Sequence, residues 1–135
     1  MNEENPAMVA ARASWSAVQR KAKEEWLALM ADDVLFQDPI GVSPLDSTGK
    51  GHVGKQAISA FWDKNMAPAT IRIDPHQSYA AGLESAHVMT LTTSFENGAR
   101  SIVTGIFTYR VNDEGKLTNL RGYWQLADMI FEKPS

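Results

Sequence analysis

The chain has 135 residues, of which 44% are hydrophobic and 21% are charged, and its formal net charge is −3. These totals are typical of one globular domain, residues 1–135, with one hydrophobic core. The negative charge and the lack of a Lys/Arg stripe argue against nucleic acid and an anionic membrane as partners.

Cysteine is absent, which excludes a disulfide framework, a thiol nucleophile and a Cys-ligated metal. The N-terminal segment 1–6 is acidic and has no apolar h-region. No apolar run is long enough to cross a bilayer. We therefore expect a cytoplasmic protein that has no signal peptide.

The first third of the chain is predicted to be helical. Pro6 suits a first helical turn, and apolar residues recur at spacings of three and four from Trp15 to Leu29. This pattern predicts helix from about Pro6 to Met30. A break near Lys23 stays open.

A short strand is predicted from Val34 to Asp38, where Pro39 ends it. The stretch 41–51 is rich in Gly, Ser, Pro and Asp, which is typical of a loop. A second helix is predicted from Gly54 to Asn65. The Gly-rich stretch 49–55 lacks the Walker pattern, so it indicates a flexible loop that leads into this helix.

The rest of the chain is mostly predicted strand, over residues 70–74, 77–81, 86–96, 101–111 and 117–131. Asn97-Gly98 is a strong hairpin signal. Helices followed by strands, without alternation, indicate an α+β fold. We expect N-terminal helices packed in a curved antiparallel sheet, forming a cone-shaped pocket that suits an apolar ligand.

Asp38 is the main catalytic candidate, because it stands at a strand end among mostly apolar neighbours. A carboxylate desolvated there has a raised proton affinity, which suits a general base near neutral pH. The alternative is that Asp38-Pro39 simply opens a turn, and spacing alone favours that alternative.

Other site types receive little support from the sequence. The three histidines, His52, His76 and His87, are scattered without metal-ligand spacing, so no metal is expected. Gly-x-Ser-x-Gly is absent. Trp15, Trp62 and Trp124 fall on predicted inward faces, where they either fill the core or offer an indole N–H to a ligand.

Several motifs resemble the bacterial Δ5-3-ketosteroid isomerases. Ala31-Asp32-Asp33 and Asp38-Pro39-Ile40-Gly41 resemble that family's Ala-Asp-Asp and Asp-Pro-Val-Gly stretch, and the similarity continues through 57–62, 94–96, 107–112 and 115–117. These enzymes belong to the nuclear transport factor 2-like (SnoaL-like) superfamily, whose fold is an α+β cone. The resemblance implies that Asp38 is a base that moves a proton from C4 to C6 of a 3-oxo-Δ5-steroid through a dienolate. It implies no metal and no organic cofactor.

The family's oxyanion hole is not reproduced in this sequence. In ketosteroid isomerase the two donors are a tyrosine and a protonated aspartate. The matching positions hold Ser14, with Trp15 beside it, and Phe107. Loss of one such donor typically costs about 10²–10³ in rate. We expect Trp15 or Trp62 to replace them, or Ser14 through a water, with Tyr109 as an alternative if the register shifts.

The resemblance also implies an apolar wall for a flat, polycyclic ligand such as a steroid, at Val18, Met30, Phe61, Met89, Leu91, Phe107 and Trp124. Two alternatives stay open. The chain is either a binding protein that lost the chemistry, or a cyclase, dehydratase or epoxide hydrolase in which His87 or Gln37 holds a water. Family members are usually homodimers, and a Thr/Ile-rich face is a suitable dimer surface, at Thr90, Thr92, Ile102, Thr104, Ile106 and Thr108.

Overall fold

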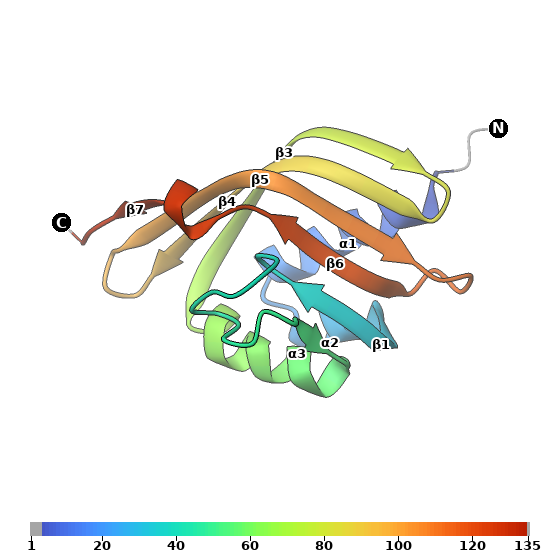
Figure 1. Ribbon diagram of the computed structural model, residues 1–135, viewed down its shortest axis with the longest axis horizontal. Helices are drawn as coiled ribbons and strands as arrows, with labels where there is room; N and C mark the ends of the chain where they lie inside the picture. Colours follow the sequence, from blue (N-terminus) through green and yellow to red (C-terminus); the bar gives the residue numbers. More distant parts are fainter. Residues whose placement is uncertain (1–3, 135) are drawn as a thin grey trace.

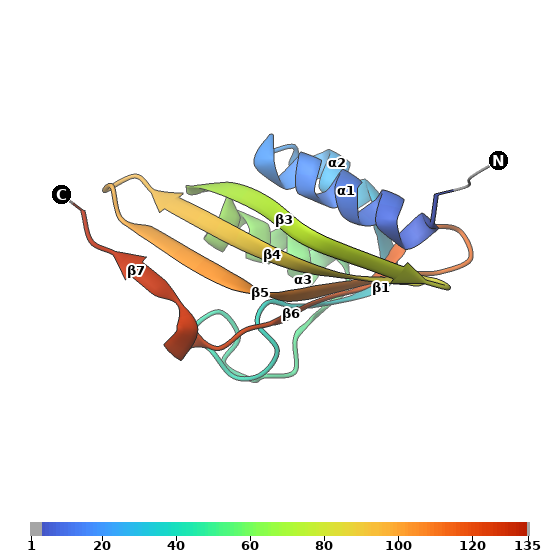
Figure 2. The same ribbon diagram turned by 90° about the horizontal axis from the view of Figure 1, so that it is seen from above.

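The computed structural model describes residues 4–134, and residues 1–3 and 135 lie outside the described part. The expectation about a signal peptide therefore concerns a segment of which half is not described. Three helices lie on one side of a curved sheet (Figures 1 and 2). They are followed along the chain by most of the strands, so the α+β prediction is confirmed.

The first predicted helix is divided into α1 (Pro6–Gln19) and α2 (Lys23–Ala28). Asn5 caps α1, because its side-chain oxygen accepts from the backbone N–H groups of Ala7 and Met8. The division falls at Lys21, whose φ of 59° is left-handed and ends the first helix. The open question of a break is thereby answered, two residues before Lys23.

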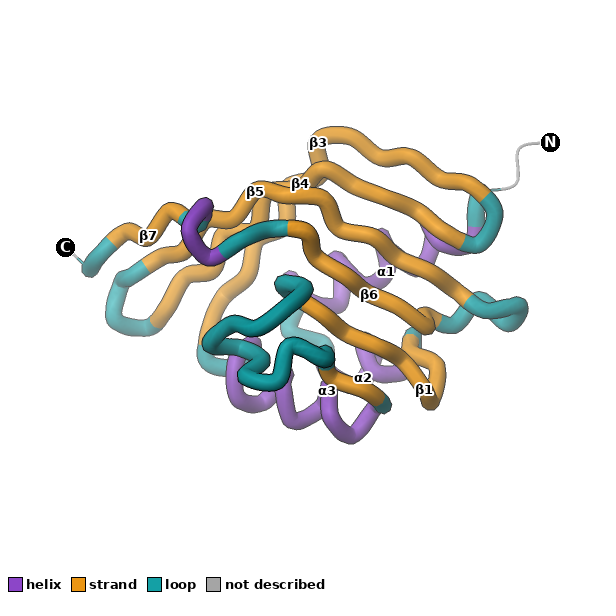
Figure 3. The backbone as a smooth tube through the Cα atoms, viewed as in Figure 1, coloured by secondary structure: helices purple, strands orange, loops and turns teal. Residues whose placement is uncertain are grey.

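The second predicted helix starts as α3 (Lys55–Phe61) and continues as the π-helical turn η1 (Trp62–Met66). Between the first strand, β1 (Met30–Gln37), and α3 lies a loop of residues 38–51, followed by the two-residue strand β2 (His52–Val53). We name residues 38–51 the β1–β2 loop. It lies at the edge of the sheet near β6 (Figure 3).

The later strands are β3 (Ala69–Ala81), β4 (Glu84–Phe95), β5 (Arg100–Val111), β6 (Leu117–Tyr123) and β7 (Ile130–Glu132). The two short strands predicted at 70–74 and 77–81 form one strand with a bulge between Pro75 and Gln77. The last predicted strand is interrupted, because the 3₁₀ turn η2 (Leu126–Asp128) separates β6 from β7. The hairpin predicted at Asn97-Gly98 joins β4 to β5.

The sheet order is β2-β1-β6-β5-β4-β3, with β7 beside β5. The predicted curved antiparallel sheet is present with one exception, because β1 lies parallel to β6 while the other strand pairs are antiparallel. A parallel pair needs a long connection, and here almost the whole chain between Gln37 and Leu117 returns it to the same direction. The core lies between the helices and the concave face of the sheet, and the large side chains of Trp26, Ile58 and Leu117 are almost fully buried there.

Candidate functional site

A cavity of about 340 Å³ lies between the helices and the concave face of the sheet. This volume falls in the range of roughly 300–1,000 Å³ that small-molecule sites occupy. Its wall is mostly apolar and includes six of the seven predicted ligand-binding residues: Val18, Phe61, Met89, Leu91, Phe107 and Trp124. The exception is Met30, which pairs with Leu117 at the start of β1 and is buried in the core instead of on the wall.

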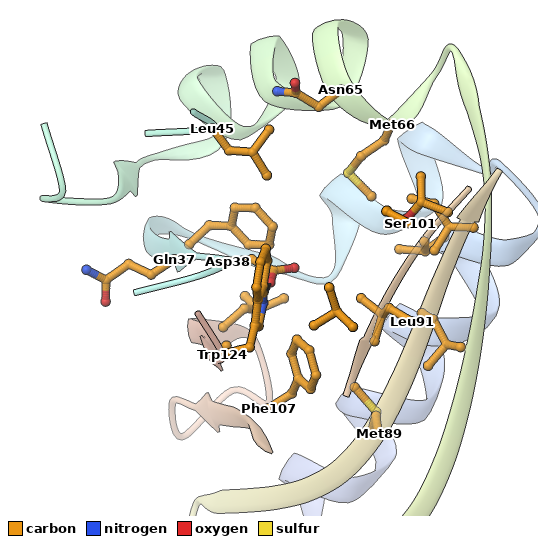
Figure 4. A pocket seen from close by; sticks show the side chains of 18 of the residues that line it. Gln37, Asp38, Leu45, Asn65, Met66, Met89, Leu91, Ser101, Phe107 and Trp124 are labelled. Atoms are coloured by element: carbon orange, nitrogen blue, oxygen red, sulfur yellow. Dashed lines mark hydrogen bonds between the residues drawn. The ribbon is translucent and has the colours of Figure 1, made fainter. Parts of the chain in front are cut away.

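Asp38 follows the last residue of β1 and points into this cavity beside Trp124 and Phe107 (Figure 4). The Trp124 indole Nε1 donates a hydrogen bond to Asp38 Oδ1 at 2.6 Å. The Ile40 backbone N–H donates to the Gly122 carbonyl at 3.0 Å, which ties the start of the β1–β2 loop to β6. Both contacts come from the end of β6, so they fix Asp38 and the start of the loop against that strand.

Gly122 provides the room that the carboxylate occupies. A Cβ atom at this position would lie 2.8 Å from Asp38 Oδ1, 3.0 Å from a ring carbon of Phe107 and 3.1 Å from Trp124 Nε1. Real Cβ atoms essentially never approach another heavy atom below 3.0 Å. A glycine at this point of β6 therefore permits the close approach of the carboxylate, the indole and the phenyl ring.

The surroundings raise the pKa of Asp38 above that of an ordinary aspartate. Desolvation is the larger cause, and the hydrogen bond from Trp124 opposes it because it stabilises the ionised form. The side chain is only partly accessible, and the access is toward the cavity. A carboxylate in this state can take a proton from a bound molecule near neutral pH and return it.

Trp15 and Tyr109 form a second polar pair on the cavity wall. The Trp15 indole Nε1 donates to the Tyr109 hydroxyl oxygen at 2.8 Å, and both side chains are buried. The Trp15 N–H is therefore engaged by the protein and is not free for a ligand. Desolvation, and secondarily the charge of Asp38, raise the pKa of Tyr109 well above its ordinary value, against the effect of the Trp15 hydrogen bond.

Ser14 and Trp62, the other two predicted oxyanion donors, are placed differently. The Ser14 hydroxyl accepts a hydrogen bond from Trp26 Nε1 at 3.0 Å, although Ser14 does line the cavity. Trp62 is not a wall residue, because its ring packs against Trp26 with the centroids 5.1 Å apart. The structure therefore brings Asp38, Ser14 and Trp15 to one cavity and leaves Trp62 in the core.

Tyr109 also lies on the cavity wall, although it was predicted to reach the site only after a shift of strand register. The alternation along 103–111 already places Tyr109 on the same strand face as Val103 and Phe107, and both of these also line the cavity. No shift of register is required. The periodicity of the strand was thus the signal that locates this hydroxyl.

The histidines lie away from the cavity wall, with each ring bonded to the protein. His87 is buried, with its two ring nitrogens within 2.8 Å of Ser85 Oγ and 2.7 Å of Ser78 Oγ. Desolvation, with a smaller effect from Arg12, lowers the pKa of His87 to about 4. Within residues 4–134, no three His, Asp or Glu side chains come together as a metal site. In the same range, no helix is long and apolar enough to cross a membrane.

Residues 11–120 match the SnoaL-like domain family. Among solved structures, the chain is similar to a Δ5-3-ketosteroid isomerase from Mycobacterium sp., with 42% identity over 96% of this chain and 100% of that chain, and a TM-score of 0.93. It is also similar to RV0760c from Mycobacterium tuberculosis in complex with estradiol-17β-hemisuccinate, with 43% identity over 95% and 100% of the two chains and a TM-score of 0.92.

A computationally designed 17-OHP binder has 40% identity over 96% of this chain and 100% of its own, with a TM-score of 0.93. A search of curated proteins found no match. An epoxide hydrolase of Mycobacterium tuberculosis, at 19% identity and a TM-score of 0.77, shares the fold alone.

Proposed function

Because the chain belongs to the family of SnoaL-like domains, we propose that it is a ketosteroid isomerase-like enzyme. Its substrate is a 3-oxo-Δ5-steroid or a similar hydrophobic ketone. Asp38 is the general base. The reaction moves one proton within the substrate and shifts a carbon–carbon double bond into conjugation with the carbonyl.

One observation carries this proposal: Asp38 is the single carboxylate on the cavity wall within residues 4–134, and apolar side chains surround it. Its raised pKa gives a base strong enough to accept a carbon-bound proton α to a carbonyl. Trp124 fixes Oδ1, and within residues 4–134 no hydrogen bond engages Oδ2, which stays available to act as the base. A base that is held in place loses little entropy when the reaction begins.

The steps balance without an added reactant. Asp38 removes the proton from C4, and the electron pair moves into the carbonyl to form a dienolate. The protonated Asp38 then returns the same proton to C6. The mostly apolar wall limits exchange of the proton with bulk water when substrate fills the cavity, and it strengthens the electrostatic effect of any donor near the developing oxyanion.

The similar proteins support a steroid-like ligand. One relative at 42% identity is a ketosteroid isomerase, another is in complex with an estradiol derivative, and a third is a designed binder of 17-OHP. Burial of a steroid in this cavity would remove several hundred Å² of apolar surface from water, which at about 25 cal/mol per Å² is enough for micromolar binding after entropic costs.

A second candidate function is binding without catalysis. It is favoured by Phe107, which lies beside Asp38 where the family's aspartate donor is expected and offers no hydrogen bond. Water-dependent chemistries, such as epoxide hydrolysis, have less support. Gln37 accepts from Arg121 Nε at 2.8 Å, and His87 is bonded to two serines off the cavity wall.

The decisive assay follows the conjugated enone that forms from 5-androstene-3,17-dione. We expect wild-type turnover above background, and we expect Asp38→Asn to lower kcat by about 10²–10⁴-fold, the usual contribution of a positioned base. Asn is isosteric and its oxygen still accepts from Trp124, so binding of the steroid is retained. Equal rates for the two proteins would refute the enzymatic role, and tight binding without turnover in either would establish the second candidate.

The homodimer belongs to the same proposal. The sheet has helices on one face only (Figure 2), and the outer face of β4, β5 and β6 exposes apolar side chains, among them Ile106 and Tyr123. We expect two copies to pair through this outer face, which leaves both cavities accessible.

A further inference from the structure

The hydroxyl of Tyr109 accepts a hydrogen bond, and its own proton has no acceptor in the described part of the chain. Its oxygen receives the indole N–H of Trp15 at 2.8 Å. Within residues 4–134 no hydrogen bond from the Tyr109 O–H to an acceptor is present, although the side chain is only 7% exposed. A buried hydroxyl donor without an acceptor costs about 1–3 kcal/mol, which a ligand oxygen would recover.

The remaining accessible surface of Tyr109 faces the cavity, since the residue is part of its wall. Trp15 occupies one lone-pair direction of the phenol and packs edge-on to its ring, with the centroids 6.2 Å apart. His87 packs edge-on against the same ring at 5.4 Å. These contacts occupy the other sides of the phenol, so the O–H is left to point toward the cavity.

The spacing between Tyr109 and Asp38 allows both side chains to contact the same bound ketone. Phe107 pairs with Gly122, and Gly122 is the residue over which the Asp38 carboxylate lies. Tyr109 is the next inward residue of β5 after Phe107, so it lies about 7 Å further along the strand. A conjugated ketone has its carbonyl oxygen and its acidic carbons separated by a few bonds, which a base and a donor at this spacing can reach together.

The Trp15 hydrogen bond makes Tyr109 a better donor. Donation to the phenol oxygen draws electron density from the O–H and stabilises partial negative charge on the oxygen, as in any chain of hydrogen bonds in a low-dielectric site. The bond also fixes the ring and hydroxyl before a ligand arrives, so no reorganisation is needed when charge develops on the substrate oxygen.

We propose that Tyr109 donates a hydrogen bond to the carbonyl oxygen of the ligand and so supplies the oxyanion hole from strand β5 instead of helix α1. Trp15 is its positioning residue. The catalytic consequence of this contact rests on the proposed isomerisation, whereas the contact itself is a property of binding. The two are therefore tested by separate measurements.

Binding is measured with 17-deoxyestradiol, whose one oxygen is a phenol, and with the matching hydrocarbon estra-1,3,5(10)-triene. Tyr109→Phe is expected to weaken binding of 17-deoxyestradiol by about ten-fold or more, equivalent to at least about 1.4 kcal/mol, and to leave the hydrocarbon affinity unchanged. The hydrocarbon is thus the control for folding of the variant. Equal changes in both affinities would overturn the proposal.

Turnover provides the second measurement. Tyr109→Phe is expected to lower kcat on 5-androstene-3,17-dione by about 10²–10³-fold, as for loss of one oxyanion donor. Suppose that neither the wild type nor any variant converts 5-androstene-3,17-dione, while Tyr109→Phe still lowers the affinity for 17-deoxyestradiol relative to the hydrocarbon. In that case the proposed function fails and this inference stands. Full turnover in Tyr109→Phe alongside an inactive Asp38→Asn would overturn the inference and leave the proposed function intact.

The role of Trp15 is tested by a double-mutant cycle. Trp15→Phe is expected to lower the selectivity for 17-deoxyestradiol over the hydrocarbon several-fold in the wild-type background and to have no further effect on it in Tyr109→Phe. A purely structural role of Trp15 would change both affinities alike in both backgrounds, and that result would contradict the positioning role.

Discussion

The carboxylate of Asp38 lies in surroundings that favour its protonated form. The proposed activity depends on this, because a carboxylate that is costly to ionise is a stronger base. Desolvation raises its pKa, while Trp124 recovers part of the loss by donating to the ionised oxygen. An aspartate in water, with a pKa of about 3.9, would be a weaker base. Ionised Asp38 therefore lowers the free energy of unfolding, and the same desolvation that causes this loss makes the carboxylate a stronger base.

Asp38→Asn is therefore expected to raise the stability of the protein at neutral pH. Because the folded-state pKa lies above the unfolded value of about 3.9, the free energy of unfolding falls as pH rises between the two values and stays lowered above them. The amide of the variant carries no charge and lacks this penalty. Urea unfolding at several pH values checks the expectation, and the gain from Asp38→Asn should vanish below about pH 3.9. In parallel, wild-type kcat/KM should rise with pH through the folded-state pKa of the free enzyme.

A greater stability gain from Asp38→Asn at acid pH than at neutral pH would contradict this account. A useful comparison is Asp33→Asn, since Asp33 is an exposed aspartate of β1. We expect Asp33→Asn to leave both the free energy of unfolding and the pH profile of the activity close to those of the wild type.

At this scale the sequence was sufficient to place Asp38 and insufficient for its partners. The strand end before Pro39 and the family motif located the carboxylate that lies on the cavity wall. The donors are determined by contacts between residues 94 and 86 positions apart, Trp15 with Tyr109 and Trp124 with Asp38. No local pattern shows that an indole N–H is already engaged, so the Trp15 N–H looked available when it is not.

Among the elements, the β1–β2 loop shows an order that its composition does not reveal. Residues 41–51 form the loop that was predicted, and Asp46 organises it. Asp46 Oδ1 accepts from the Thr48 N–H and hydroxyl and from the Gly49 N–H, and Oδ2 accepts from the Gly51 N–H at 2.8 Å. Desolvation acts to raise the pKa of Asp46, but these hydrogen bonds outweigh it and the pKa is lowered. The loop thereby holds Ser43, Pro44 and Leu45 against the cavity.

Asp46→Ala is expected to loosen this loop and weaken ligand binding. The loss of four hydrogen bonds to one carboxylate removes the order that places Leu45 on the wall, and we expect Kd for 17-deoxyestradiol to rise by about ten-fold, equivalent to about 1.4 kcal/mol. Fluorescence titration measures it. Ser47→Ala is the matched control, because Ser47 is exposed and its side chain makes no hydrogen bond within residues 4–134. A Kd for Asp46→Ala equal to that of Ser47→Ala would argue against an ordered loop.

The periodicity of the sequence predicted the type of most elements well. It predicted less well which strands pair and in which direction. The alternation along 86–96 and 101–111 gave the register that puts Met89 and Phe107 on the inner face. The parallel pairing of β1 with β6 joins residues more than 80 positions apart. Such a pair is selected by the packing of the helices between them, which periodicity does not contain.

Over the whole molecule, the sheet separates two surfaces with different composition. The helices lie on the concave face (Figures 1 and 2), and the cavity lies on the same face. The outer face of β4 and β5 carries threonines and isoleucines. On this outer face Thr90 Oγ1 and Thr104 Oγ1 are 2.8 Å apart, and Ile106 is 46% exposed. A surface with exposed apolar side chains is suited to pairing with a second copy of itself.

The last prediction tests that pairing. Ile106→Lys is expected to shift the protein from dimer to monomer, because two-fold symmetry would bring two buried ammonium groups into one interface without partners. Sedimentation velocity measures the change. Val9→Lys is the control, since Val9 is also 46% exposed but lies on α1, on the helical side of the sheet. A wild-type protein that sediments as a monomer would show that this face does not form a dimer interface. A dimer that persists in Ile106→Lys would place the interface on another surface. Since the cavity opens on the opposite side of the sheet, the monomeric variant should retain its affinity for 17-deoxyestradiol.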